Sequence, residues 1–274
     1  MSSTTHPNNN SQVELPIGSS GRSAKEVAIA AAGLAERVIV RGFSKVQRIS
    51  YKGRRDVVTD TDVAAEKAIM TLIRAEFPDH GLMAEESGTA AGQTDFQWVI
   101  DPLDGTFNYS QSIPVFCTSI ALAYQGEVIL GVIKDPLRRE LYTAVKGQGA
   151  TLNGRPMRVS SKTDISNTAI GFDLGYNEAL RKKALDHAAM LLPLVGTLRL
   201  FGSAALALAL TAAGRYDAFY HHWLFPWDLA AGVLMVTEAG GCATDWAGNP
   251  VTLGTRDVLA SNHVLHDKIL EILR

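Results

Sequence analysis

The chain has 274 residues, of which 46% are hydrophobic and 20% are charged, and its formal net charge at pH 7 is -2. This length allows a large core in one unit or in two closely joined halves, which excludes a small disulfide-stapled module. Because the charge balance gives no basic footprint, we expect no nucleic-acid partner.

The N-terminal part of the chain is predicted to contain a tail, two helices and two strands. Residues 1–22 are rich in Ser, Thr, Asn, Gly and Pro. They cannot bury enough apolar area to offset the entropy lost on ordering, so we expect a disordered tail without a catalytic role. Apolar residues at helical spacing predict helices over about 24–42 and 62–76. Short apolar runs predict strands near residues 82 and 97.

Further along, the pattern predicts paired strands and then strands that alternate with helices. The dipeptide Gly126-Glu127 separates two apolar runs and predicts a hairpin, which is joined by a third strand at 140–144. The second half is predicted to contain strands at 168–172, 197–200, 216–220, 241–244 and 258–260, and helices at 177–192, 203–213, 228–239 and 262–273. This order indicates an α+β fold with layered helices and sheets, because a simple doubly wound sheet alternates throughout.

Cysteine usage and the absence of a long apolar run both favour a cytoplasmic protein. Only Cys117 and Cys242 occur, each in an apolar segment, which is typical of reduced core thiols. The most apolar stretch, residues 204–213, is too short to cross a bilayer and is better interpreted as a buried helix. The N-terminus also lacks the basic and apolar regions of a signal peptide. We therefore expect a cytoplasmic location and no membrane partner.

The segment D-P-L-D-G-T, residues 101–106, follows an apolar run that is predicted to be a buried strand. Pro102 fixes its own φ and lacks an amide hydrogen, so we expect the chain to leave the sheet there. Both Asp side chains can then turn toward one point. Clustered carboxylates repel unless a cation lies between them, and hard oxygen ligands select Mg²⁺ or Mn²⁺. The same residues also suit a capped turn, with Asp104 as the N-cap.

Three other segments place acids at the ends of predicted elements. D-V-V-T-D-T-D, residues 56–62, precedes a predicted helix that some of its acids must cap. A-E-E-S-G, residues 84–88, ends a short apolar strand, where adjacent Glu side chains point opposite ways, so only one is expected to enter a site. W-D-L-A-A-G, residues 227–232, opens a predicted helix whose Asp is also positioned as a cap.

Together and in this order, the four segments resemble the inositol monophosphatase family of Mg²⁺-dependent, lithium-sensitive phosphatases. The resemblance covers about residues 25–274 and implies the family's fold, a layered αβαβα sandwich. It also implies an N-terminal α+β half, residues 23–160, that carries most metal ligands. The C-terminal α/β half, residues 161–274, would carry the W-D motif and the substrate pocket. Because the family commonly forms homodimers, we expect a homodimer here.

The resemblance assigns metal ligands by position. Glu85, Asp101 and the carbonyl oxygen of Leu103 would bind one ion. Asp101, Asp104 and Asp228 would bind a second, so that Asp101 bridges the two. We expect two or three Mg²⁺ ions, with Mn²⁺ as an alternative. Two such metals can hold the attacking and leaving oxygens of an in-line displacement and lower the pKa of a bound water, so the nucleophile would be water.

The resemblance also assigns residues that aim the water and hold the phosphate. Thr106 and Glu85 are expected to orient the water, and Asp56 is expected to hold the Thr106 hydroxyl. The alternative for Asp56 is a helix cap without chemistry. The backbone amides of Gly105 and Thr106 are expected to begin a short helix and bind phosphate.

The substrate-facing positions match the family only in part. Gly202, Ser203 and Ala204 match the family's G-T-A turn. The family usually carries a Glu seven residues before the W-D aspartate, where it contacts substrate hydroxyls, and that position here is His221. The neighbouring His221 and His222 suggest a transition-metal site, but no third His or Cys is nearby in the sequence, so polar residues at a pocket rim are the preferred interpretation.

These motifs favour a phosphomonoesterase that acts on a small polyol or sugar phosphate, with inositol 1-phosphate as the first candidate. Histidinol phosphate, fructose 1,6-bisphosphate and 3'-phosphoadenosine 5'-phosphate are alternative substrates, and His221 counts against the cationic histidinol phosphate. The D-x-x-D spacing disfavours a haloacid-dehalogenase-type phosphatase, which needs D-x-D. The non-enzyme alternative is a metal-binding regulatory protein that keeps the fold without turnover.

Overall fold

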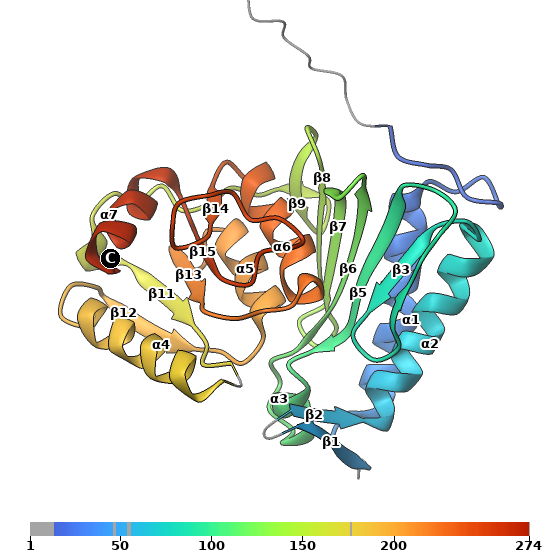
Figure 1. Cartoon of the computed structure of the whole chain (residues 1–274), viewed down its shortest axis with the longest axis horizontal. Helices are drawn as coiled ribbons and strands as arrows, with labels where there is room; N and C mark the ends of the chain where they lie inside the picture. The colour runs from blue at the N-terminus through green and yellow to red at the C-terminus, as the bar shows by residue number, and fades with distance from the viewer. Residues whose placement is uncertain (1–13, 46–47, 54–55, 176, 274) are drawn as a thin grey trace, which may run out of the picture.

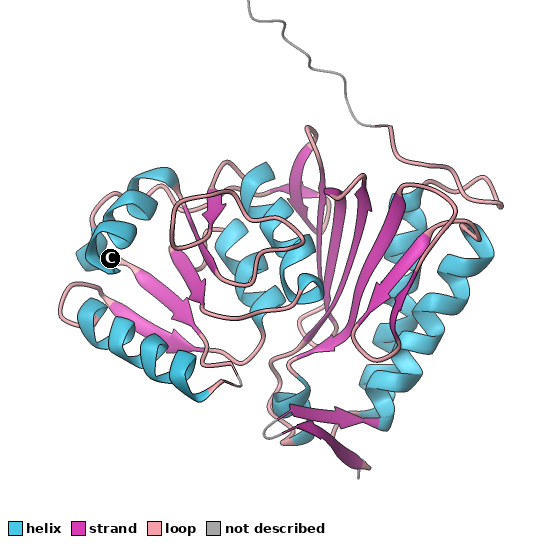
Figure 2. Ribbon diagram, viewed as in Figure 1, coloured by secondary structure: helices cyan, strands magenta, loops and turns pink. Residues whose placement is uncertain are grey.

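The computed structural model describes residues 14–45, 48–53, 56–175 and 177–273. Helices and sheets are stacked in five layers (Figures 1 and 2). Helices α1 (Ala24–Gly42) and α2 (Asp60–Glu76) cover the outer face of an eight-stranded sheet. Helices α5 (Ala204–Ala212) and α6 (Pro226–Glu238) separate this sheet from a five-stranded sheet, which α4 (Glu178–Leu191) and α7 (His263–Leu273) cover on the outside. The predicted αβαβα sandwich is confirmed.

The large sheet has the strand order β10-β9-β8-β7-β6-β5-β3-β4. Its strands are β3 (Gly81–Ala84), β4 (Gly88–Ala90), β5 (Phe96–Asp104), β6 (Cys117–Tyr124), β7 (Glu127–Asp135), β8 (Glu140–Val145), β9 (Gly149–Leu152) and β10 (Arg155–Pro156). All neighbours are antiparallel except β3 and β5, which run parallel. β5 is buried over most of its length, as expected for a strand covered on both faces, and it carries the D-P-L-D segment at its end.

The smaller sheet has the strand order β12-β11-β13-β15-β14. Its strands are β11 (Ala169–Phe172), β12 (Thr197–Leu200), β13 (Ala218–His221), β14 (Cys242–Thr244) and β15 (Val258–Ser261), with the short 3₁₀ helix η1 (Ile165–Asn167) before them. β11 and β13 run parallel, so the segments that follow them emerge at the same edge of the sheet. The ends of β11 and β13 lie on the side of the smaller sheet that faces the end of β5 (Figure 1).

The outer helices begin where their capping residues lie. Ser23 caps α1 through a reciprocal pair of hydrogen bonds with Glu26, and one face of α1 is a buried stripe rich in alanine. Thr59 caps α2 in the same way, because its backbone amide and hydroxyl both donate to Asp62 Oδ2, at 2.8 and 2.5 Å. Asp62 is therefore fixed at the first turn of α2, next to the cavity described below.

The central layer depends on small residues that allow close packing. A Cβ atom at Gly232 of α6 would lie 2.5 Å from Leu208 Cβ of α5, and one at Gly131 of β7 would lie 2.9 Å from the Ala231 carbonyl oxygen. A side chain at either glycine would force these elements apart. One core cluster contains residues of β5, β6, α5 and α6, so the two predicted halves of the sequence share a core.

Several elements differ from the sequence-based expectation. The hairpin turn is Gln125-Gly126, with φ angles of 51° and 81°, and β7 already begins at Glu127. Positive φ at both turn positions matches the right-handed twist of the flanking strands. Strand β4 and the short hairpin of β1 (Ile49–Gly53) and β2 (Asp56–Thr59) were not expected from the sequence.

The N-terminal segment begins to make contacts before α1. Residues 1–13 of the predicted tail lie outside the described residues. Within residues 14–22, the Ser20 amide donates to Glu76 Oε2 over 3.1 Å, and Arg22 forms an ion pair with Glu76 at 2.6 Å. This segment therefore packs against the end of α2. Among the residues that the structure describes, no helix combines the length and apolarity needed to cross a bilayer.

Candidate active site

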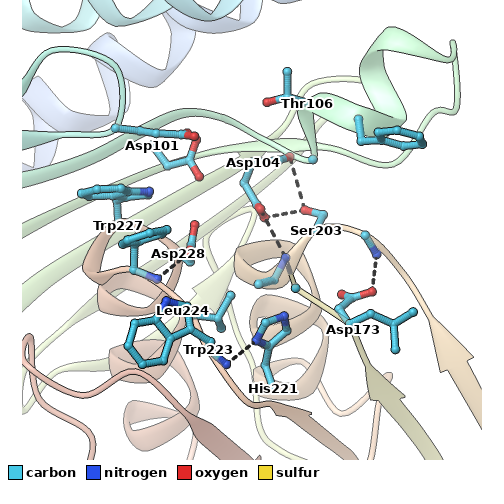
Figure 3. A pocket seen from close by; sticks show the side chains of 18 of the residues that line it. Asp101, Asp104, Thr106, Asp173, Ser203, His221, Trp223, Leu224, Trp227 and Asp228 are labelled. Atoms are coloured by element: carbon cyan, nitrogen blue, oxygen red, sulfur yellow. Dashed lines mark hydrogen bonds between the residues drawn. The ribbon is translucent and has the colours of Figure 1, made fainter. Parts of the chain in front are cut away.

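A cavity of about 660 Å³ lies between the end of β5 and the first turns of α3 (Thr106–Ser110), α5 and α6. Oxygen atoms of Asp101, Asp104 and Asp228, one from each, lie within 4.8 Å of one another. Figure 3 shows these three carboxylates pointing toward one another in the cavity. Two segments far apart in the sequence, the end of β5 and the first turn of α6, thus meet at one point, and two of the three carboxylates are buried.

The two Asp side chains of β5 converge because the strand contains a bulge. Asp101 pairs with Ser119 and Asp104 pairs with Cys117, so the register shifts across Pro102 and Leu103. The expectation that the chain leaves the sheet at Pro102 is therefore wrong, since β5 continues to Asp104. Pro102 lacks an amide hydrogen and fits a bulge for that reason. The Leu103 amide donates to Asp101 Oδ1 over 2.9 Å and holds that carboxylate in place.

Asp104 is held by the first turn of α5. Its Oδ2 accepts hydrogen bonds from the Ser203 hydroxyl at 2.5 Å and from the Ala205 amide at 2.8 Å, and its Oδ1 accepts from the Ala204 amide at 3.3 Å. Helix N-termini stabilise negative charge through their free amides. Ser203, which the sequence placed facing the substrate, therefore also orients a predicted metal ligand.

Asp228 lies in the first turn of α6, where it has two functions at once. Its Oδ2 accepts from the Phe225 amide over 2.7 Å, which caps the helix, and the same carboxyl group lines the cavity. Glu85 follows β3 and also lines the cavity, whereas Glu86 is not part of its lining. This agrees with the expectation that only one of the adjacent Glu residues enters the site.

Burial is the largest cause of the raised pKa values of the Asp residues in this cluster. It raises the pKa of Asp101 well above its ordinary value, and the charges of Glu85, Asp104 and Asp228 raise it further. Burial also raises the pKa of Asp104 and of Asp228. A divalent cation between the carboxylates would remove this cost, and an all-oxygen donor set suits Mg²⁺ or Mn²⁺. The chemistry of the donor set therefore fits the metals that the motifs imply.

The hydroxyl of Thr106 is held by Asp62, a role that the resemblance assigned to Asp56. Thr106 Oγ1 lies 2.8 Å from Asp62 Oδ1 and 2.9 Å from the carbonyl oxygen of Leu103. Asp62 is the residue fixed by the capping box with Thr59, so the first turn of α2 aims it at the end of β5. Asp56 lies six residues earlier, at the start of β2. The T-x-x-D spacing from Thr59 to Asp62 is the sequence signal of a capping box, and it was available to mark Asp62 as the acid fixed at the start of α2.

Gly105 and the turn at Gly202 bring two backbones together above the cavity. Gly105 has a φ of 96° and precedes the short helix α3, as expected from the sequence. A Cβ atom there would lie 2.9 Å from the Val115 carbonyl oxygen and 3.1 Å from the Gly202 carbonyl oxygen. Asn108 of α3 donates to the Phe201 carbonyl oxygen at 3.0 Å. The expected substrate turn, Gly202 to Ala204, is thereby tied to α3, whose first amides are expected from the sequence to bind phosphate.

The far side of the cavity is formed by residues that follow β11 and β13. His221 ends β13 and lines the cavity, with Trp223 and Leu224 beside it (Figure 3). Asp173 and Arg181 line the same region, and sequence reasoning missed both. Asp173 Oδ1 accepts from the Phe201 and Gly202 amides at 2.9 and 2.7 Å, so Asp173 holds the substrate turn. Neither residue stands in a motif. The pairing of β11 with β13 brings both to the cavity, and the sequence alone does not show that pairing.

Comparisons with known proteins agree with the fold. The family described as "Inositol monophosphatase family" matches residues 22–274. The chain belongs to the inositol monophosphatase family.

Two relatives illustrate the range of names within this similarity. The chain is 41% identical over 246 residues to "Nus factor SuhB" of Escherichia coli strain K12, a match that covers 86% of this chain and 90% of that protein. It is 40% identical over 255 residues to "Inositol-1-monophosphatase" of Synechocystis sp., covering 90% of this chain and 88% of that protein.

Solved structures give the same picture. The extragenic suppressor protein SuhB of Bartonella henselae matches with a TM-score of 0.88 and 36% identity, covering 91% of this chain and 97% of that chain. The Thermotoga maritima IMPase matches with a TM-score of 0.85 and 32% identity, covering 90% of this chain and 95% of that chain. The fold is therefore that of inositol monophosphatase and SuhB proteins.

Proposed function

We propose that this chain is a Mg²⁺-dependent phosphomonoesterase that hydrolyses a small polyol or sugar phosphate, with inositol 1-phosphate as the first candidate. The observation that carries the proposal is the meeting of three carboxylates within 4.8 Å beside a Thr hydroxyl that is itself held by a carboxylate. Family membership supports phosphatase activity, and a relative named "Inositol-1-monophosphatase" supports the choice of first substrate.

The proposed ligands are the five that the motifs assign. Glu85, Asp101 and the Leu103 carbonyl oxygen would hold one Mg²⁺, and Asp101, Asp104 and Asp228 a second, with a third ion and Mn²⁺ as further options. When bound, the metal would neutralise the substrate phosphate and activate a water. The protein's own contribution is a set of carboxylates already oriented by the amides of Leu103, Ala205 and Phe225.

Thr106 is proposed to aim the attacking water. Its hydroxyl hydrogen is directed to Asp62 or to the Leu103 carbonyl, so its oxygen is left to accept a hydrogen bond from water. A water that donates to a fixed acceptor presents its lone pair in a defined direction, which Glu85 would help to set. The backbone amides of Gly105 and Thr106 begin α3 and are proposed to contact the substrate phosphate.

The remaining parts of the proposal concern the state of the protein. We propose that it acts in the cytoplasm, as a homodimer, without a nucleic-acid or membrane partner. The formal net charge of -2 supports the view that it does not depend on nucleic acid.

A phosphate-release panel tests the proposed function. The purified full chain would be assayed with Mg²⁺, and separately with EDTA, on inositol 1-phosphate, fructose 1,6-bisphosphate, histidinol phosphate, 3'-phosphoadenosine 5'-phosphate and glycerol 2-phosphate. We expect release that needs the metal and is largest for a polyol or sugar phosphate. A folded protein that releases no phosphate from any of these substrates with Mg²⁺ or Mn²⁺ would contradict the proposal.

The second candidate is a metal-binding regulatory protein without turnover. It is favoured by the name "Nus factor" that several relatives carry. Under this alternative Mg²⁺ would still raise the melting temperature, because the carboxylate cluster would still bind it, but no substrate in the panel would be hydrolysed. Melting and phosphate release measured on the same sample therefore separate the two candidates.

A further inference from the structure

His221 presents a hydrogen-bond donor to the cavity, which follows from its partner on the other side of the ring. Its Nδ1 accepts a hydrogen bond of 3.0 Å from the Trp223 amide, so Nδ1 carries no proton. The neutral ring must then carry its proton on Nε2. Burial lowers the pKa of His221 to about 3, so the ring stays neutral at physiological pH. The family's Glu at this position is an acceptor, so the polarity of the position is reversed.

Arg181 places a second donor in the same part of the cavity. It lies in the first half of α4, it lines the cavity, and it is only partly buried. One of its nitrogens, Nη1, donates to the Gly175 carbonyl oxygen over 2.7 Å. A guanidinium has five N–H donors in a planar fork that matches a carboxylate or phosphate. Within the described part of the chain, the recorded ion pairs include none to Arg181.

Gly175 brings these two donors together. β11 and β13 are parallel neighbours with Phe172 opposite Tyr220, so the chain that follows β11 runs beside His221. A Cβ atom at Gly175 would lie 3.0 Å from His221 Cε1, and the same residue accepts the hydrogen bond from Arg181. One backbone position therefore contacts both side chains.

Asp173 is the acid in this region that would repel an anionic ligand, and its hydrogen bonds and burial limit that repulsion. Its Oδ1 is occupied by the Phe201 and Gly202 amides, and its Oδ2 is sealed from solvent without a hydrogen-bond partner among the described residues. Burial raises its pKa to about 7, so near neutral pH it carries only part of a negative charge. His221 and Arg181 therefore each supply a donor to this part of the cavity lining.

We propose that His221 and Arg181 select a substrate whose leaving group carries a second anionic group, a carboxylate or a second phosphate. The inference rests on the proposed phosphatase function and narrows its substrate class, because it favours a polyol or sugar phosphate with a second anion over inositol 1-phosphate, whose leaving group is neutral. Two donor side chains, one of them a cation, attract an acceptor-rich group, whereas the hydroxyls of a neutral polyol would leave the guanidinium without its preferred partner. The substrate would bind with its ester phosphate at the carboxylate cluster and its second anion at Arg181.

Two matched substrate pairs test this selectivity. The members of each pair differ in the second anion: 2-phosphoglycerate against glycerol 2-phosphate, and fructose 1,6-bisphosphate against fructose 1-phosphate. For each pair, kcat/KM for the substrate with the second anion is divided by kcat/KM for the substrate without it. The first pair places a carboxylate close to the ester and the second a phosphate further away, so the pair that responds identifies which anion is bound.

Three variants would be compared with the wild type. Arg181→Gln keeps an amide donor for the Gly175 carbonyl but removes the charge, and His221→Glu restores the family's acceptor. Lys182→Ala is the matched control, because Lys182 is the next residue of α4, is exposed, and pairs with Asp186 at 2.7 Å. We expect the wild type to favour the anionic member of at least one pair. Arg181→Gln should lower that ratio by about tenfold, the scale of one charge-assisted hydrogen bond.

His221→Glu should lower the same ratio at least as far, because a carboxylate repels the second anion, and Lys182→Ala should leave it within about twofold of the wild type. A wild type without preference in either pair, or an Arg181→Gln variant with an unchanged ratio, would overturn the inference while phosphate release itself persists. If the wild type released phosphate from no substrate, the proposed function would fail, and the inference with it. Melting temperatures of all variants show whether a loss reflects unfolding.

Discussion

The two sides of the cavity are built on different principles. On the β5 side, each carboxylate of the cluster is held by a backbone amide, and the residues that carry the chemistry stand in short motifs at the ends of strands and helices. On the β13 side, His221 ends a strand, Asp173 lies in a loop and Arg181 lies in a helix, and neither Asp173 nor Arg181 stands in a motif. The carboxylates of the cluster are marked by short motifs in the sequence, whereas the residues of the opposite side are brought to the cavity by the pairing of β11 with β13.

The largest expected effect is on the cluster side, at its central acid. Asp101→Asn should lower turnover by about a thousandfold, because an amide cannot balance the charge of two cations. Without metal, the variant should melt at the same temperature as the wild type or above it, since one repelling charge is gone from a buried cluster. Mg²⁺ should then raise its melting temperature only weakly. Phosphate release and thermal melting check both statements, and near wild-type turnover would refute the assignment.

The next effect distinguishes Asp62 from Asp56. Asp62→Asn should lower turnover by about a hundredfold, because Thr106 loses the carboxylate that fixes its hydroxyl and misplacement of a reacting group has costs on that scale. Asp56→Asn is the matched control and should keep turnover within a few fold. Steady-state kinetics with both variants decides the matter. The reverse order of effects would restore Asp56 to the role that the motif alone suggested.

A smaller effect is expected where the central layer supports the cluster. Ser203→Ala removes the hydroxyl that donates to Asp104 Oδ2 at 2.5 Å, and loss of such support typically weakens metal affinity by about tenfold or more. The apparent Mg²⁺ requirement should therefore rise while turnover at saturating Mg²⁺ changes little. A Mg²⁺ titration of initial rates measures this. If turnover fell and the Mg²⁺ requirement did not change, Ser203 would act on the substrate instead.

The smallest expected effect is inhibition by lithium, which family membership makes a natural test. Li⁺ should lower the rate in an uncompetitive or mixed manner, because a small monovalent ion would occupy a cation position after product forms. Rates at increasing Li⁺ and several substrate concentrations give the pattern, with Na⁺ at the same ionic strength as the control. Equal rates in both salts would place this chain outside the lithium-inhibited branch, even if Mg²⁺ dependence remained.

Much of the fold follows from patterns that act over short distances. The bounds expected for α1 agree with the structure, because Ser23 and Glu26 form a capping box before a clear apolar stripe. The acids of the cluster were found for the same reason, since they stand at the ends of periodic segments. The turn at Gln125 was misplaced by one residue, because Gly126 marks a turn without showing which neighbour joins it.

The rest depends on contacts that a linear pattern does not contain. The bulge at Pro102 requires the partner strand β6, and the choice of Asp62 over Asp56 requires the first turn of α2 to meet the end of β5. Asp173 and Arg181 carry no motif and reach the cavity through the parallel pairing of β11 and β13. The sequence marks these residues as ordinary polar positions, and only the three-dimensional arrangement gives them a site.

The most direct test of the central claim is a calorimetric titration of Mg²⁺ into the metal-free protein in two buffers of different ionisation enthalpy. We expect saturable binding that releases protons, because burial and mutual repulsion raise the pKa values of Asp101 and Asp228 when no cation is present, and bound metal requires the deprotonated groups. Affinity should therefore weaken as the pH falls. Absence of Mg²⁺ binding, or binding that Asp101→Asn leaves unchanged, would contradict the proposed metal site.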